Sequence, residues 1–153
     1  MTTLDDVYRK FGETAEAAQL LETELGNIAL WEEGARNQLL EGKDPDKAED
    51  LLLKINKQTL GTLLRNLGKS TNDLDPLAEQ LELALAARNR LMHGFYERHN
   101  FRRNSSEGCD LMLADLEELH GEILGAYVSL LKLHGFDPET ADIPAPTEHL
   151  NLR

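Results

Sequence analysis

Arg88 and His93 are the two side chains of this sequence whose types and spacing could act together on a phosphate. Both lie in the stretch RNRLMH at residues 88–93, inside an otherwise apolar helical repeat. Apolar residues recur there at spacings of three and four, and Arg88 takes one place in that stripe. The other members of the stripe are Leu77, Leu81, Ala84, Leu91 and Phe95. A buried guanidinium without a partner is costly, so Arg88 must be paired or must line a wet cavity.

A second, polar face of the same helix carries Asn89, His93, Tyr96 and Asn100. Their spacing stacks the side chains one above another. Arg88 and His93 are about 140° apart around an ideal helix, so they do not share a face, although both could reach one substrate phosphate. Two simpler interpretations stay open. The arginine stem can pack while its head reaches water, and the histidine can make only structural hydrogen bonds.

The charge of the chain is unevenly distributed. A net charge of −12 argues against broad, non-specific binding to nucleic acid or to an anionic membrane. Five of the nine arginines nevertheless fall within residues 88–103, where only Glu97 opposes them: Arg88, Arg90, Arg98, Arg102 and Arg103. Such a basic patch could accept one phosphodiester segment while the remaining surface repels the polyanion.

Length and composition indicate one domain that needs no disulfide bonds for stability. A chain of 153 residues can bury a real core. The single cysteine, Cys109, excludes an intrachain disulfide and is expected to be a packed or partly exposed thiol. The N-terminus has early acids and no apolar signal region, and no stretch is long and apolar enough to span a membrane. We therefore expect a cytoplasmic protein without membrane partners.

The first helix is predicted by apolar residues at alternating spacings of three and four. They are Leu4, Val7, Phe11, Thr14, Ala18, Leu21, Leu25 and Ile28. The pattern continues less cleanly through Trp31, Ala35 and Leu39. Because Gly26 and Gly34 could bend the chain, both one long helix and two shorter ones remain open.

The second and third helices each begin with an aspartate cap followed by a proline at the first helical position. These pairs are Asp44–Pro45 and Asp75–Pro76. The second helix carries one apolar face from Leu51 to Leu67 and ends at Gly68. The third helix runs to about Asn100 and is followed by a loop.

The fourth helix begins after Ser105 or Ser106 and ends at Gly135. Its apolar stripe is Met112, Leu116, Leu119, Ile123, Ala126, Leu130 and Leu133. The predicted architecture is an all-α, antiparallel bundle of four to five helices over residues 1–135. Residues 136–153 form a proline-containing tail that we expect to be flexible.

A metal centre is not expected. Glu117 and His120 have the Glu-x-x-His spacing of di-iron bundles, but such a site needs a second motif and two further glutamates. His120 is more simply a core histidine with its hydrogen bonds satisfied, although it could line the same cavity as His93. We predict neither a metal nor a cofactor.

The string RNRLMH resembles the signature of the HEPN superfamily. That signature is an arginine, a polar residue that is often asparagine, three further residues and a histidine, on a helix of an all-α bundle. Arg88, Asn89 and His93 match it in order. The segment KQTLGTLLRNLGK also looks like a stretch that accompanies the motif in bacterial HEPN-like proteins. The resemblance covers roughly residues 4–134, and its specificity lies in the six-residue string.

The resemblance implies metal-independent RNA cleavage at a site formed between two copies in a homodimer. His93 would be the general acid or base, Arg88 would hold the phosphate, and Asn89 would orient one of them. Side chains expected to contact the RNA are Arg90, Tyr96, Arg98, Arg102 and Arg103. The resemblance also implies a toxin-like role in stress response or defence, with a cognate antitoxin or another protein partner.

One feature departs from the HEPN toxins that are paired with nucleotidyltransferase antitoxins. In those toxins a tyrosine, which is the modified residue, commonly follows the histidine by two positions, whereas here Tyr96 follows His93 by three. Regulation through tyrosine modification is therefore in doubt, and Tyr96 is either a substrate contact or a structural tyrosine. Two alternatives to the nuclease stay open. One is a HEPN-like module that binds RNA or protein without cleavage, and the other is a plain helical dimer in which Arg88 and His93 make structural bonds.

Overall fold

The computed structural model describes residues 1–36, 45–70 and 73–141, and within these ranges the chain is helical, without strands. The described residues form five α-helices and two 3₁₀ segments. They are α1 (Leu4–Arg36), α2 (Pro45–Asn56), α3 (Leu60–Ser70), η2 (Asp75–Leu77), α4 (Ala78–His99), η3 (Asn100–Asn104) and α5 (Ser106–Leu133). The all-α prediction is confirmed. None of these helices is long and apolar enough to cross a membrane.

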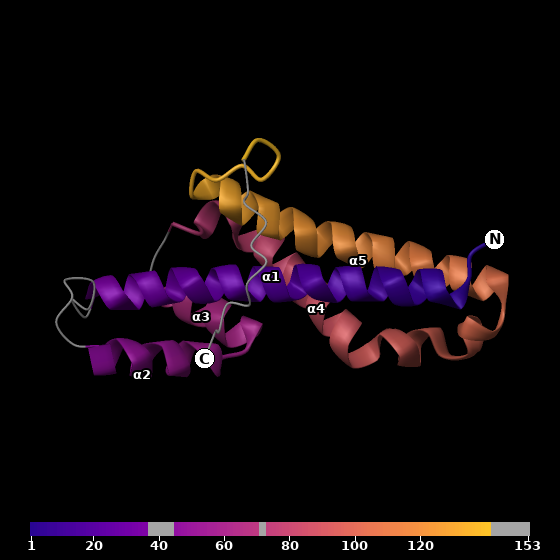
Figure 1. Ribbon diagram of the computed structural model, residues 1–153, viewed down its shortest axis with the longest axis horizontal. Coiled ribbons are helices and arrows are strands. Elements are labelled where there is room, and N and C mark those ends of the chain that lie inside the picture. Colours follow the sequence, from indigo (N-terminus) through magenta and orange to yellow (C-terminus); the bar gives the residue numbers. More distant parts are fainter. Residues whose placement is uncertain (37–44, 71–72, 142–153) are drawn as a thin grey trace.

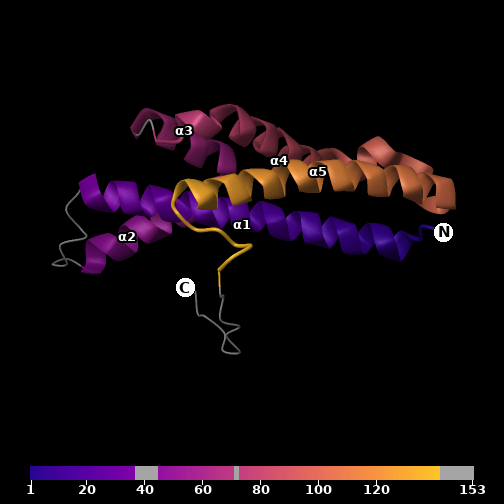
Figure 2. The ribbon, with the colours of Figure 1, turned by 90° about the horizontal axis from the view of Figure 1, so that it is seen from above.

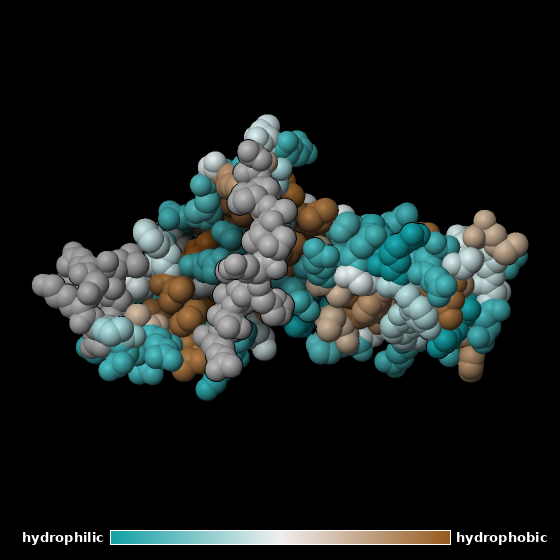
Figure 3. All heavy atoms as spheres, in the orientation of Figure 1, coloured by the Kyte–Doolittle hydropathy of each residue, from teal (hydrophilic) through white to brown (hydrophobic). Residues whose placement is uncertain are grey.

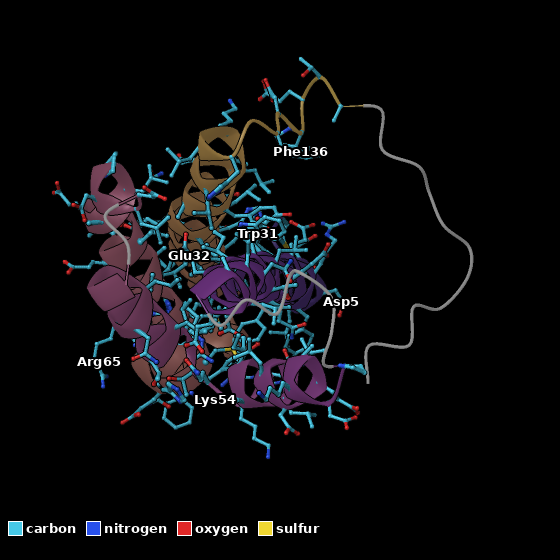
Figure 4. All side chains as sticks on the ribbon, turned by 90° about the vertical axis from the view of Figure 1, so that its left-hand side faces the viewer. Asp5, Trp31, Glu32, Lys54, Arg65 and Phe136 are labelled. Atoms are coloured by element: carbon cyan, nitrogen blue, oxygen red, sulfur yellow. The ribbon has the colours of Figure 1, made fainter. Side chains whose placement is uncertain are left out.

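The helices form an elongated bundle with α1 at its centre. α1 runs the length of the molecule with α5 lying along it (Figure 1). Seen from above, α3 and α4 lie on one side of α1, and α2 lies on the other (Figure 2). The end-on view also places α1 between α5 and α2 (Figure 4). α1 is one continuous helix, so Gly26 and Gly34 do not interrupt it.

The bundle is antiparallel between consecutive helices and parallel between the first and the last. The Ser106 hydroxyl at the start of α5 donates to the Thr2 carbonyl just before α1, at 3.3 Å. Near the other end, Glu24 on α1 lies close enough to Tyr127 on α5 for its charge to raise the pKa of the phenol. These pairs advance together along both helices, so α1 and α5 run parallel. Five helices that reverse direction at each step necessarily return to the starting direction (Figure 1).

One hydrophobic core follows the predicted stripes. The stripe of α5 is buried from Met112 to Leu130, and only Leu133, at 41% exposure, lies outside. On α4 the buried members are Leu81, Ala84, Leu91 and Phe95, joined by Ala87. α1 contributes Val7, Thr14, Ala18, Leu21 and Leu25. The face shown in Figure 3 has apolar residues gathered where α2 and α3 meet α1.

The last turns of α1 use a different face from the predicted one. Trp31 is 65% exposed and Ala35 is exposed, whereas Ala29 and Gly34 are buried. The apolar repeat weakens in this region, so periodicity alone does not determine which side faces the core. Leu39 lies outside the described residues.

The predicted second helix is two helices. Pro45 is the first residue of α2, as expected, while Asp44 lies outside the described residues. α2 ends at Asn56, and α3 begins at Leu60 after the Thr59 hydroxyl accepts a hydrogen bond from the Thr62 backbone N–H at 3.3 Å. Thr59 is thus an N-cap in the middle of the expected helix. Gly68 lies within α3 and does not end it.

The ends of α5 follow the prediction. Ser105 is the N-cap, and its hydroxyl accepts from the Gly108 backbone N–H at 3.0 Å. At the other end Gly135 has a positive φ of 82°. The Phe136 and Gly135 amides donate to the carbonyls of Leu131 and Lys132, each at 3.0 Å, which satisfies two carbonyls of the last turn.

The predicted start of the third helix and the predicted loop after it differ from the structure. α4 begins only after the 3₁₀ segment η2, which holds Asp75 and Pro76. The expected loop after Asn100 is the 3₁₀ segment η3, which we call the η3 turn. Of the predicted tail, residues 142–153 lie outside the described residues.

Candidate functional site

Arg88, which stands in the apolar stripe of α4, forms an ion pair with a carboxylate of the same chain. Its Nε donates to Glu22 Oε1 on α1 at 2.8 Å, and its Nη1 donates to Asn89 Oδ1 at 3.3 Å. The side chains of Arg88 and Glu22 are 22% and 31% exposed. Arg88 therefore packs its stem beside the stripe while part of the guanidinium still reaches solvent, and its burial does not require a second copy.

His93 lies on the exposed side of α4. Among the described residues, no hydrogen bond or ion pair includes it. A plain structural role for both motif residues predicted that neither would reach solvent, and His93 does not fit that prediction. The structure thus joins Arg88 to Asn89 by a hydrogen bond, while His93, one turn beyond Asn89, stays exposed and bonds to neither of them.

Tyr96 is part of an aromatic group between α1 and α4. Its ring centroid lies 5.3 Å from that of Phe11 and 5.1 Å from that of Phe95. Burial and the nearby Tyr8 raise the pKa of the Tyr96 phenol, against the opposing effect of Arg103. Tyr96 is still about half exposed, so it combines a packing role with access to solvent.

The five clustered arginines differ in their partners. Arg90 donates to Asp115 on α5. Arg102 Nη1 donates to His99 Nδ1 at 3.0 Å, and Arg103 Nη2 donates to the Tyr8 hydroxyl at 2.9 Å. In the described part of the chain, no ion pair includes Arg98, Arg102 or Arg103. The predicted basic patch therefore separates into two neutralised and three uncompensated arginines.

A buried group centred on His99 and Asp115 escaped the sequence analysis. His99 Nε2 and Asp115 Oδ2 are 2.7 Å apart, while Arg90 bonds the other carboxylate oxygen. Because Arg102 can only donate, His99 Nδ1 accepts, and the neutral ring carries its proton on Nε2 toward Asp115. Burial raises the pKa of the Asp115 carboxyl, but the His99 hydrogen bond and Arg90 outweigh it, and the net pKa is lowered.

The His99 group is structural in its present form, because both ring nitrogens and both carboxylate oxygens are engaged. A sequence signal existed for it. His99 lies four residues beyond Phe95, so it continues the apolar stripe of α4 and is buried like its other members. Asp115 directly precedes Leu116 in the buried stripe of α5. A polar residue at the end of one stripe required a partner on the helix packed against it.

A separate cluster of polar side chains joins α1 and α5. Lys10 Nζ lies 3.1 Å from His120 Nδ1 and 3.3 Å from Glu13 Oε2. Burial and the Lys10 charge lower the pKa of His120. His120 lines a pocket of about 220 Å³ with residues of α1 and α5 alone, so it does not share a cavity with His93. The described residues contain no group of side chains able to hold a metal ion.

Two remaining features are apolar. Cys109 is buried, with its Sγ 3.8 Å from the Arg103 carbonyl. A groove of about 460 Å³ between α3 and α4 is lined mainly by leucines and small residues, with Arg65 and Glu82 among its polar members. Arg65 points away from the bundle (Figure 4).

No protein-family model matches this chain, and neither do the curated proteins or the solved structures with which it was compared.

Proposed function

We propose that the protein is a HEPN-type endoribonuclease that cleaves RNA without a metal and acts as a homodimer in stress response or defence. The observation that supports this proposal is the state of the motif on α4. His93 is exposed and makes no bond with the described residues, while Glu22 and Asn89 orient the partly exposed guanidinium of Arg88. The polar residues of the motif are therefore available to a substrate.

The proposed reaction uses the ribose 2′-hydroxyl as its nucleophile. His93 takes the hydroxyl proton as the 2′-oxygen attacks the adjacent phosphorus. The bond from phosphorus to the 5′-oxygen breaks, and the protonated His93 returns that proton to the leaving 5′-oxygen. The products are a 2′,3′-cyclic phosphate and a 5′-hydroxyl, so the reaction consumes no water and needs no metal-bound nucleophile. Arg88 holds the phosphate oxygens while negative charge develops on them.

A homodimer follows from the helix geometry in this proposal. Arg88 and His93 point about 140° apart around α4, so one copy does not readily surround a phosphate. Two copies with facing α4 helices would place two arginines and two histidines around one groove. A toxin-like role would further need a cognate antitoxin or another protein partner that covers this groove.

The test is cleavage of a mixed cellular RNA pool in EDTA. Wild type is compared with His93→Ala and Arg88→Ala. The matched controls are His134→Ala, at an exposed histidine after α5, and Arg9→Ala, at an exposed ion-paired arginine. We expect cutting by wild type and both controls, with cyclic phosphate ends, and loss of cutting in both motif variants. Equal activity in all five proteins would reveal a contaminant.

A second candidate function is RNA binding without cleavage. The observation that favours it is the Glu22 carboxylate, which neutralises Arg88 and would repel a phosphate placed beside it. In this case wild type cuts nothing, and Glu22→Gln tightens RNA binding because Arg88 regains its net charge. The nuclease instead predicts that Glu22→Gln lowers the cutting rate, because the guanidinium loses its orienting partner.

A further inference from the structure

Only part of the arginine cluster carries positive charge that no carboxylate of the described residues balances. Arg88 and Arg90 are each matched by a carboxylate, from Glu22 and Asp115. The remaining arginines bond to neutral groups or to none of the described residues: Arg98, Arg102 and Arg103. Uncompensated positive charge in this acidic protein therefore concentrates at the end of α4 and in the η3 turn.

An exposed aromatic side chain belongs to the same turn as these charges. Phe101 is 77% exposed, more than any other large apolar side chain of the described residues except Met1. Its neighbours in sequence are Asn100 and Arg102. Tyr8 and Tyr96 are also exposed, and Arg103 bonds the Tyr8 hydroxyl. Apolar area left in water has no stabilising role in the folded chain, whereas an exposed ring in the same turn as several arginines offers a surface on which a base can stack.

The η3 turn is held firmly in spite of its exposed side chains. His99 anchors its start through Asp115, and the Ser105 hydroxyl caps α5 at its end. Gly108 packs so closely that a Cβ there would lie 1.9 Å from the Arg102 carbonyl oxygen. Asn100 has a positive φ of 40°, which turns the chain out of α4. A fixed turn presents Phe101 and its arginines with little ordering cost on binding.

We propose that the η3 turn binds a single-stranded RNA segment, with one base stacked on Phe101 and the flanking phosphates on Arg98, Arg102 and Arg103. This proposal rests on the proposed function and names the form of RNA that the site accepts. Single strands are selected because a stacked, paired base inside a duplex cannot also cover an aromatic side chain. The same α4 that carries His93 leads directly into this turn, so the strand would pass from the turn to the motif.

Binding is tested apart from cleavage in the full chain carrying His93→Ala, which keeps the probe intact. The probe is a fluorescein-labelled oligouridylate, compared with its duplex with oligoadenylate, by fluorescence anisotropy. We expect Phe101→Ala to weaken binding of the single strand about tenfold and to leave duplex binding unchanged. Phe101→Trp, which keeps a stacking surface, should restore the affinity.

The matched control is Trp31→Ala. Trp31 is also an exposed aromatic, but it lies on α1 about 35 Å along the helix from Tyr8. Equal losses for Phe101→Ala and Trp31→Ala, or for single strand and duplex, would overturn the stacking role. Competition by oligoglutamate at the same concentration as RNA would instead assign the turn to an acidic protein partner.

The outcomes separate this proposal from the nuclease. Binding of the single strand that depends on Phe101, without cutting by wild type, would retain the η3 site and reject the ribonuclease. If wild type cuts RNA and Phe101→Ala cuts it with the same KM, the ribonuclease is retained and the η3 site is rejected. If folded wild type cuts no RNA and folded His93→Ala binds none, both the ribonuclease and the η3 site are rejected.

Discussion

At the scale of single residues, the arginine in the apolar stripe shows what a sequence can reveal. The spacing of α4 identified Arg88 as an anomaly and required a partner or a wet cavity. It could not identify Glu22, which is 66 positions away and meets Arg88 only because α1 packs antiparallel to α4. His99 posed the same problem at the end of the stripe. Recognising that a partner is needed is a local inference, whereas naming it requires the packing of the helices.

Asp115 is the residue on which the buried polar group depends. Replacement by asparagine keeps the shape but leaves Arg90 without a charged acceptor and removes one of the two oxygens that bond Arg90 and His99. We expect Asp115→Asn to lower the free energy of unfolding at pH 7 by about 1–3 kcal/mol. Urea denaturation with the Asn variant and wild type side by side would measure the loss. A loss no larger than that of an exposed acid such as Glu118→Gln would contradict this role.

The pH dependence of that loss has a definite sign. The pKa of Asp115 is lower in the folded protein than its ordinary value near 3.8. Its ionised form therefore adds stability that is fully present above the ordinary value and is lost as the pH falls through the folded value. The stability difference between wild type and Asp115→Asn should narrow as the pH falls below about 3.8. A difference that stays constant to the lowest pH at which both proteins fold would contradict this role of Asp115.

At the scale of elements, the sequence predicted what is encoded locally. The stripe and cap of α5 needed only the spacing of its leucines and the Ser105 position. The division between α2 and α3 was missed because apolar spacings of three and four resume at Leu60, and the single spacing of five from Ile55 and the Thr59 cap are weak local signals. The η3 turn was taken for a loop because its stability comes from contacts with α5 and not from its own residues.

The contact between the η3 turn and α5 depends on Gly108. An alanine there would meet the Arg102 carbonyl at 1.9 Å, so the turn or the helix must shift. We expect Gly108→Ala to lower the free energy of unfolding by about 1–3 kcal/mol. Gly121→Ala is the matched control on the same helix, because nothing lies within 4 Å of its Cβ. That control should stabilise the protein by about 0.5–1 kcal/mol, and thermal unfolding of both would show opposite signs. An unchanged free energy of unfolding in Gly108→Ala would mean that the η3 turn moves away from the added methyl group at little cost.

At the scale of the whole molecule, the proposed site requires two copies joined through α4. Met92 is 50% exposed and lies next to His93 on this helix. A charge there would be buried in such an interface without a partner. We expect wild type to be a dimer in sedimentation equilibrium and Met92→Glu to be a monomer with unchanged helicity. Leu53→Glu, at an exposed leucine of α2, should remain dimeric. A monomeric wild type at micromolar concentration would remove the shared site.

The whole charge distribution sets how RNA binding responds to salt. Three uncompensated arginines would release counterions from about three phosphates, which gives a slope of log K against log salt of about −2 for a single strand. The remaining surface carries the excess negative charge of a chain at −12, and its repulsion is screened as salt rises, so the observed slope should be −2 or shallower. Anisotropy titrations of His93→Ala between low and physiological salt give this slope directly.

Arg98→Ala should make the slope shallower by a further fraction of one unit, since each arginine contributes separately. A slope several units steeper would mean that the strand contacts cations well beyond the η3 turn, and the three-arginine footprint would have to be abandoned.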